Sequence, residues 1–241
     1  MPVAHDTILT RYMPFTSFAS MLEHGLFIPK ATLFDDKLEG VLHYFNTDQH
    51  TSVMSRDEIR RCLEWVYVSC WCARSPESHA MWRVYGGRYD EAIAIQTSER
   101  QLRIASYGLR HMYSSLDTVR YEEPEPRLGS RIGPEIARLW DGQTPGLTIY
   151  AALFSFVKHV GYEFEQEVRL VSVDPEAQPD RENPKPGVRL NPVETREMIR
   201  NIIVGPRAPD WLLELTRDLA ARYGVNHVVI RRSSLDEEGK R

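Results

Sequence analysis

The sequence predicts a single α+β domain, residues 1–241, built around a mixed and split central sheet. Short apolar segments rich in β-branched residues alternate irregularly with segments of helical periodicity, which is typical of a mixed sheet covered by helices. The patterns G-x-G-x-x-G and G-x-x-x-x-G-K-[ST] are both missing from the sequence, which argues against Rossmann and P-loop sites. With 241 residues, of which 42% are hydrophobic, the chain is long enough to bury a sizeable core.

The first half of the chain contains two segments with clear helix boundaries. Thr16 precedes one segment, which Gly25 ends, and Ser75-Pro76 precedes the other, which Gly86-Gly87 ends. A further helix is expected over 56–65. The predicted strands of this half cover 6–13, 66–72 and 91–97.

The second half repeats this alternation around a proline-rich stretch. Residues 174–187 contain four prolines among charged residues, so we expect a solvated loop there. The tail 235–241 is expected to fray. The predicted helices cover 148–160, 192–199 and 208–224, and the predicted strands cover 117–122, 165–173, 200–205 and 226–233.

Charge and composition exclude several classes of protein. The formal net charge is −4, so no global basic field attracts nucleic acid or anionic lipid. No run of 18 apolar residues occurs, and the N-terminal segment lacks the order of a signal peptide. The three cysteines, Cys62, Cys70 and Cys72, are an odd number. Together these features predict reduced, metal-free thiols in a cytoplasmic protein without membrane contact.

The most informative motif is E-x-E-x-R, formed by Glu165, Glu167 and Arg169. Alternate residues of a strand share a face, so these three charged side chains are expected to lie together. One interpretation is a solvent-facing edge strand with a ladder of ion pairs. The other is a catalytic face, where two neighbouring carboxylates raise the pKa of one another and the preceding Tyr162 and Phe164 form a pocket wall.

A second group of candidates lies around the predicted strand 66–72. Ser69 is a hydroxyl in an apolar strand, and its partner is either a backbone carbonyl or a functional group. On the following helix, Trp82 and Tyr85 are core residues or part of a pocket. Cys70-x-Cys72 is tighter than the usual zinc spacing and no second ligand pair appears, so no metal site is expected.

Arg11 and Tyr12 are a third pair of candidates, in the first predicted strand. An arginine within an apolar strand either binds an anion or extends to water from an edge strand. No G-x-S-x-G is present, so a hydrolase nucleophile elbow is not expected.

Across most of its length the chain resembles a bacterial family known as domain of unknown function 2971. The resemblance rests on Leu9-Thr10-Arg11-Tyr12, on the segment 34–40, on Trp82, Tyr85 and Gly87, and on Lys158 followed by E-x-E-x-R. Lys37 stands where the family usually has proline after aspartate. This family resemblance implies no activity by itself.

The order of Arg11, Ser69 and Glu165-x-Glu167 also resembles the R-S-E signature of mono-ADP-ribosyltransferases, whose fold matches the split sheet expected here. The resemblance implies that Arg11 holds NAD near its phosphates, with Tyr12, Trp82, Tyr85, Tyr162 and Phe164 packing around the dinucleotide. It also implies that Ser69 supports Glu167, that Glu167 stabilises the oxocarbenium-like state, and that Glu165 activates the acceptor. The usual S-T-S motif is replaced by Ser69-Cys70-Trp71.

The sequence therefore favours an enzyme that cleaves the nicotinamide N-glycosidic bond of NAD and transfers ADP-ribose to an unknown macromolecular or small-molecule acceptor. Such chemistry needs charge stabilisation and positioning without a metal. By analogy, phage defence or toxicity to a rival cell would suit this activity. Two alternatives stay open: a metal-dependent nuclease using Glu167 with Asp36 or Glu39, and a non-enzymatic interaction or regulatory module.

Overall fold

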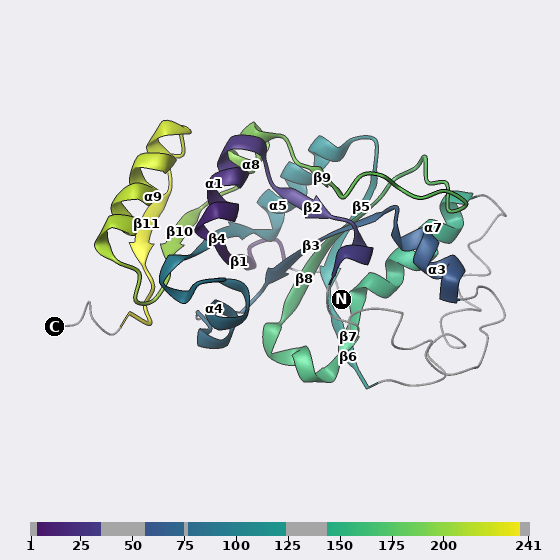
Figure 1. Cartoon of the computed structure of the whole chain (residues 1–241), viewed down its shortest axis with the longest axis horizontal. Coiled ribbons are helices and arrows are strands. Elements are labelled where there is room, and N and C mark those ends of the chain that lie inside the picture. The colour runs from purple at the N-terminus through teal and green to yellow at the C-terminus, as the bar shows by residue number, and fades with distance from the viewer. Residues whose placement is uncertain (1–3, 35–55, 75–76, 124–143, 237–241) are drawn as a thin grey trace. The chain divides into compact units, whose positions relative to one another are not determined.

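The computed structural model describes residues 4–34, 56–74, 77–123 and 144–236 (Figure 1). The chain forms two compact units, and each is assembled from separate segments. The first unit contains the described residues within 28–70 and 109–188, and the second contains the other described residues. The expectation of a single domain over 1–241 stays a prediction.

The second unit is built on four strands in the hydrogen-bonded order β11–β10–β4–β1. Strand β1 is antiparallel to β4, with Ile8 opposite Ser98 and Pro14 opposite Ala92, whereas β10 and β11 run parallel. The sheet is therefore mixed, as the sequence predicts. The strands are β1 (Ile8–Pro14), β4 (Ala92–Ser98), β10 (Asn201–Val204) and β11 (Val229–Arg232).

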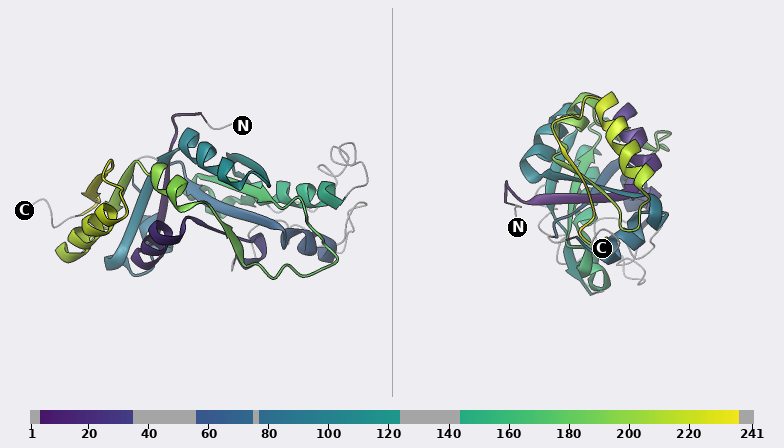
Figure 2. Two further views of the ribbon diagram at one scale, coloured as in Figure 1. Left: turned by 90° about the horizontal axis from the view of Figure 1, so that it is seen from above. Right: turned by 90° about the vertical axis from the view of Figure 1, so that its left-hand side faces the viewer.

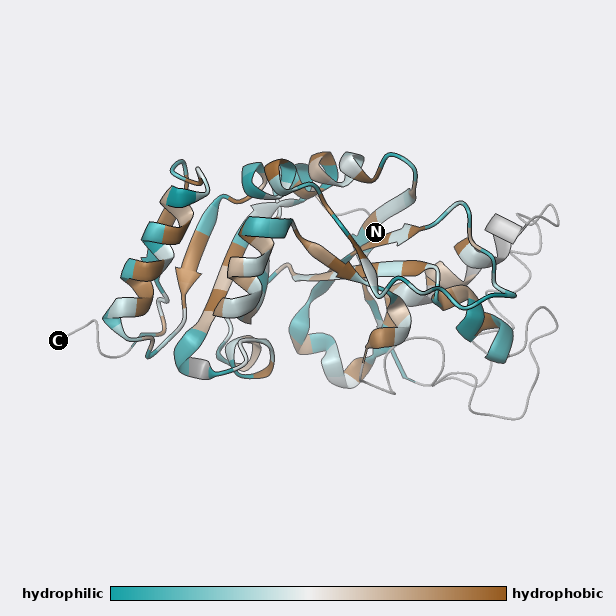
Figure 3. Cartoon of the chain, turned by 45° about the horizontal axis from the view of Figure 1, so that its top comes forward, coloured by the Kyte–Doolittle hydropathy of each residue, from teal (hydrophilic) through white to brown (hydrophobic). Residues whose placement is uncertain are grey.

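Amphipathic helices cover the strands of the second unit. Helix α9 shows the pattern most clearly, because Leu212, Thr216 and Ala220 recur at every fourth residue and are buried. Figure 3 shows its apolar and polar faces, and Figure 2 shows the helix beside β11. The helices of this unit are α1 (Phe15–His24), α4 (His79–Tyr85), α5 (Glu99–Ser106), α8 (Pro192–Glu197) and α9 (Asp210–Arg222).

The first unit contains three strands in the order β3–β8–β5 and a small parallel sheet of β6 and β7. Strand β3 (Val66–Cys72) ends in the second unit, where Cys72 lies opposite Thr10 of β1. The other elements of the first unit are α3 (Arg56–Leu63), β5 (Tyr113–Thr118), β6 (Arg120–Glu122), α7 (Thr144–Leu153), β7 (Val157–His159) and β8 (Glu167–Val173).

Short elements complete both units. Strands β2 (Phe27–Pro29) and β9 (Gly187–Arg189) pair with each other. The 3-10 helices are η1 (Ala31–Leu33), η2 (Tyr89–Glu91), η3 (Tyr107–Leu109), η4 (Phe154–Phe156) and η5 (Val160–Glu165).

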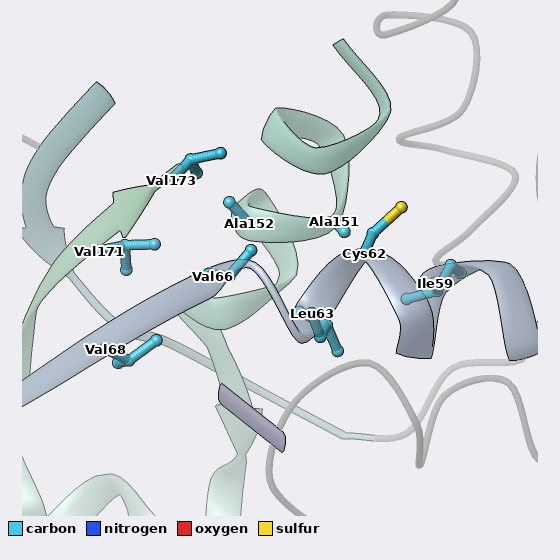
Figure 4. Close-up of a cluster of buried hydrophobic side chains, with 9 residues drawn as sticks. All are labelled: Ile59, Cys62, Leu63, Val66, Val68, Ala151, Ala152, Val171 and Val173. Carbon is cyan, nitrogen blue, oxygen red and sulfur yellow. The ribbon is translucent and has the colours of Figure 1, made fainter. Parts of the chain in front are cut away.

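A compact apolar cluster forms where α3 and α7 pack on β3 and β8 (Figure 4). Val66 and Val68 of β3 and Val171 and Val173 of β8 lie in this cluster. The helices contribute Ile59, Cys62, Leu63, Ala151 and Ala152. Because every second side chain of a strand lies on the same face, one face of this sheet packs against the two helices. Burial in this cluster raises the pKa of the Cys62 thiol to about 11, so this thiol stays protonated at neutral pH.

Three boundaries in the first unit differ from the sequence prediction. The helix predicted over 148–160 ends at Leu153, and residues 157–159 form a strand that pairs with β6. The strand predicted over 117–122 is interrupted at Val119, because β5 pairs with β8 whereas β6 pairs with β7. Strand β8 begins at Glu167 because Gln166 has a left-handed conformation with φ 44°.

The proline-rich segment 174–187 is mostly irregular, as expected, but it is not solvated throughout. The Asn183 side chain is buried and donates to the backbone oxygen of Glu64 and to the Tyr67 hydroxyl. At the expected frayed tail, Asp236 contacts Arg232, while 237–241 lie outside the described residues. Within the described part of the chain, no helix is both long enough and apolar enough to cross a membrane.

Glu77 joins the start of α4 to the end of β11 in the second unit. Its carboxylate accepts hydrogen bonds from Trp82 Nε1, Ser233 Oγ, Ser234 N and Arg231 Nη1. Burial raises the pKa of Glu77, but the donated hydrogen bonds and the Arg231 charge outweigh burial, so the pKa lies below its ordinary value. The ionised form of Glu77 therefore stabilises the fold.

Glu77→Gln is expected to lower the free energy of unfolding by about 2 kcal/mol at pH 7, because charge-assisted hydrogen bonds are lost. A carboxyl with a depressed pKa stabilises the fold above its unfolded pKa, and this stabilisation disappears as the pH falls through the folded value. The difference from wild type should therefore shrink between about pH 5 and pH 3. Urea unfolding measures both effects, and the exposed Glu214→Gln is the control; a difference independent of pH would contradict the account.

Candidate functional site

Four charged side chains of the first unit form a buried charge cluster, consisting of Lys158, Glu165, Glu167 and Arg169. Each of them is 5% exposed or less. Lys158 Nζ lies 2.6 Å from Glu165 Oε2 and 3.4 Å from Glu167 Oε2. Arg169 donates from Nε to Glu167 Oε1 at 2.9 Å and from Nη2 to Glu167 Oε2 at 2.8 Å. The E-x-E-x-R motif is therefore one connected network, completed by a lysine from β7.

Local backbone geometry brings the members of this cluster together. Glu167 and Arg169 share a face of β8, as the sequence predicts, but Glu165 is the last residue of η5. The left-handed Gln166 between them turns the chain, so the two carboxylates meet at Lys158 without lying on one strand. The Tyr121 hydroxyl accepts a hydrogen bond from Glu167 N at 2.7 Å and joins β6 to the cluster.

The electrostatics of the cluster differ from the sequence expectation. Two carboxylates and two cations balance, so repulsion between the glutamates is offset. Burial raises the pKa of Glu167, but the Arg169 charge and its hydrogen bonds outweigh burial, and the pKa lies below its ordinary value. The expectation that neighbouring carboxylates raise the pKa is therefore wrong for Glu167. The Glu167 carboxylate is ionised at neutral pH.

The interpretation of this strand as a solvent-facing edge is also wrong. Strand β8 lies between β3 and β5, and all seven of its residues are buried. Among the aromatic candidates, the Tyr162 ring lies 4.5 Å from Lys158 Nζ, a cation–π distance. Phe164 is 38% exposed. Tyr162 therefore belongs to the surroundings of the cluster.

Strand β3 contributes Cys70 to the cluster, a residue to which the sequence analysis gave no role in the site. The Cys70 side chain hydrogen-bonds to Glu167 and lowers the pKa of that carboxyl. Successive side chains of a strand face opposite sides, so the buried Ser69 side chain points away from the face that carries Cys70. The supporting role of Ser69 stays a prediction. Cys62, Cys70 and Cys72 all lie in the described part of the chain, and no disulfide bond joins any of them.

In the second unit, a cavity of about 430 Å³ lies between β1 and α1. We call it the arginine cavity, because Arg11 and Arg189 line it together with Tyr12, Tyr85 and hydroxyl-bearing residues of α1. Its volume falls within the range of small-molecule sites in proteins. Three residues selected from the sequence as dinucleotide ligands, Arg11, Tyr12 and Tyr85, thus line one cavity.

The remaining aromatic candidate, Trp82, supports the cavity from behind. Trp82 is fully buried, and its ring meets Tyr12 edge to face with centroids 4.8 Å apart. The Tyr12 hydroxyl accepts a hydrogen bond from Ser78 N, and burial raises the pKa of Tyr12 to about 12. Tyr12 is therefore neutral at pH 7. Arg11 lies over the Trp71 ring, 5.9 Å from its centroid.

The structure gives no support to a metal site within the described residues, where no group of three or more His, Cys, Asp or Glu side chains is placed to hold an ion. Asp36 and Glu39, the further ligands of the nuclease alternative, lie outside the described residues.

No family model matches the chain, and no curated protein matches it. Among solved structures, the chain is similar to DarT of Thermus sp. 2.9. The complex with carba-NAD+ is 10% identical with a TM-score of 0.40 over 97% of this chain and 98% of that one. The complex with ADP-ribosylated ssDNA is 8% identical with a TM-score of 0.41 over 98% and 97%. Because both TM-scores lie below 0.5, the likeness carries no weight for the activity of this chain.

Arg169→Met is expected to lower the free energy of unfolding by about 3–5 kcal/mol, because it removes the guanidinium that donates two hydrogen bonds to the buried Glu167 carboxylate. The double variant Arg169→Met/Glu167→Gln should be less destabilised than the sum of the single variants, since the second change removes the unpaired charge. Urea unfolding of wild type, both single variants and the double variant completes the cycle. The exposed Arg110→Met is the control, and additive effects would contradict a coupled network.

Proposed function

We propose that this protein is an NAD-dependent ADP-ribosyltransferase. The observation that carries the proposal is the arginine cavity, where Arg11, Tyr12 and Tyr85, selected from the sequence for dinucleotide binding, line one cavity with a second arginine. Guanidinium groups favour phosphate because their N–H donors match its oxygens in geometry and charge. We assign Arg11 to the phosphates of NAD.

The buried charge cluster supports the second part of the proposal, the cleavage of NAD. Breaking the bond between the ribose carbon and nicotinamide nitrogen leaves the electron pair on nicotinamide, which departs neutral, and positive charge develops on the ribose. A fixed negative charge stabilises that state. Glu167 suits this role because Arg169 and Lys158 hold its carboxylate in place and in the ionised form.

Glu165 has a separate role in the proposal. The acceptor atom forms a bond to the ribose carbon and loses a proton, which a nearby carboxylate accepts. The Glu165 carboxylate lies 2.6 Å from Lys158 Nζ, which also contacts Glu167. Incubation with labelled NAD and cell lysate, followed by nuclease or protease treatment, identifies the class of acceptor.

Glu167→Gln is expected to lower the kcat for NAD cleavage by about 100-fold or more, because the lost charge acts on the transition state. The Kd for NAD should change by less than about threefold, since the positive charge on the ribose that Glu167 stabilises develops mainly in the transition state. Calorimetric titration and a nicotinamide-release assay measure the two quantities. Exposed Glu163→Gln is the control, and circular dichroism establishes that each variant is folded. A folded Glu167→Gln variant with full activity would show that another group stabilises the charge.

Arg11→Ala is expected to raise the Kd for NAD by about 10-fold or more, because it removes a charge-assisted contact to phosphate. The kcat at saturating NAD should fall much less than in Glu167→Gln. Titration with NAD at several salt concentrations measures the loss, and the exposed Arg200→Ala is the control. A wild-type protein that neither binds nor cleaves NAD would instead favour the non-enzymatic module.

A further inference from the structure

Arg189 occupies a fixed position in the wall of the arginine cavity. Its Nη1 donates to the Gly25 backbone oxygen at 2.9 Å, and its guanidinium carbon lies 5.1 Å from the centre of the Phe27 ring. One hydrogen bond and one aromatic face thus hold a side chain that is otherwise exposed. The conformational entropy lost when an arginine binds an anion is therefore partly lost already in the free protein.

The backbone around Arg189 explains why this position is fixed. Leu190 N donates to Leu26 O at 3.0 Å, which ties the segment to residues 25–27. Gly25 has φ 85°, and a Cβ at this position would lie 1.9 Å from Leu190 O. Only glycine permits so close an approach of the two backbones. Gly25 therefore sets the distance between the Arg189 segment and the end of α1.

The charge of the cavity calls for an anionic ligand. Arg11 and Arg189 both line it, and none of its described lining residues is an aspartate or a glutamate. Within the described part of the chain, no carboxylate lies within 4.0 Å of the Arg189 guanidinium. A guanidinium has five N–H donors, and the bond to Gly25 uses one of them. Two positive charges in one cavity repel each other, and an anion bound between them offsets this repulsion.

We propose that Arg189 is the second diphosphate-binding residue of this cavity, so that Arg11 and Arg189 each contact the diphosphate of a nucleoside diphosphate. Thr16, Ser17 and Ser20 line the same cavity, and hydroxyl groups of this kind donate and accept hydrogen bonds. The inference rests on the proposed function, because the diphosphate is that of NAD. It adds a residue outside every motif that the sequence analysis used.

The test compares binding of ADP, AMP and adenosine to wild type, Arg189→Gln and Arg189→Lys by calorimetric titration. Arg189→Gln should weaken ADP binding by roughly 10- to 100-fold, the range expected for a lost charge-assisted contact, and adenosine binding by less than about twofold. The affinity of Arg189→Lys for ADP should lie between those of wild type and Arg189→Gln, because lysine keeps the positive charge but lacks the planar guanidinium group. Arg217→Gln, an exposed arginine of α9 outside the cavity, is the matched control.

Three results of the titrations would overturn the inference: wild type that does not bind ADP, Arg189→Gln that behaves like Arg217→Gln, or equal losses for ADP and adenosine. Nicotinamide release by the same proteins separates this failure from failure of the proposed function. ADP binding that depends on Arg189, in a protein that does not cleave NAD, supports the inference and contradicts the transferase. NAD cleavage with an unchanged KM in Arg189→Gln supports the transferase and contradicts the inference.

Discussion

The arrangement of the candidate catalytic residues depends on the buried ammonium group of Lys158. This group contacts the carboxylates of both Glu165 and Glu167. These two residues flank Gln166, whose left-handed backbone turns both carboxylates toward the same cation. A buried lysine without a carboxylate would be strongly unfavourable, and so would either glutamate without a cation. The pairing of β7 with β6 sets the buried Lys158 opposite Tyr121, whose hydroxyl accepts a hydrogen bond from Glu167 N.

The charge cluster and the apolar cluster of the first unit share one face of the β3–β8 sheet. Every second residue of a strand shares a face, so Val66, Val68 and Cys70 lie on one side of β3. On β8 the same holds for Val173, Val171, Arg169 and Glu167. The face thus changes from apolar contacts with α3 and α7, which Figure 4 shows, to the paired charges of Lys158, Glu165, Glu167 and Arg169. Arg169 links the two parts, since its Nη1 donates to the Ser155 oxygen just after α7. The apolar packing fixes the strand positions on which the charged contacts depend.

The two candidate regions differ in how their charges are balanced. The charge cluster contains two acids and two bases and is neutral by itself, which suits residues that hold a carboxylate ionised and in place. The arginine cavity is lined by two arginines and by no described acidic residue, which suits a site for an anionic ligand. This difference agrees with the roles proposed above, because cationic side chains attract an anionic ligand, whereas a carboxylate held in place stabilises a developing positive charge.

The sequence by itself determined the mixed strand-and-helix order, the common face of Glu167 and Arg169, and the selection of Arg11, Tyr12 and Tyr85. The strand-and-helix order and the common face follow from local periodicity, whereas Arg11, Tyr12 and Tyr85 were selected through the resemblance to the R-S-E signature. Only the tertiary structure decided that β8 is an interior strand, that Lys158 pairs with both glutamates, that Cys70 is the β3 residue in contact with Glu167, and that Arg189 faces Arg11's cavity. The strand order, the Cys70 contact and the position of Arg189 depend on residues far apart in the chain, and the Lys158 contacts depend on the turn at Gln166. The pKa of Glu167 differs from its expected direction because the folded strand holds the Arg169 guanidinium against the carboxylate with two hydrogen bonds, which periodicity alone does not show.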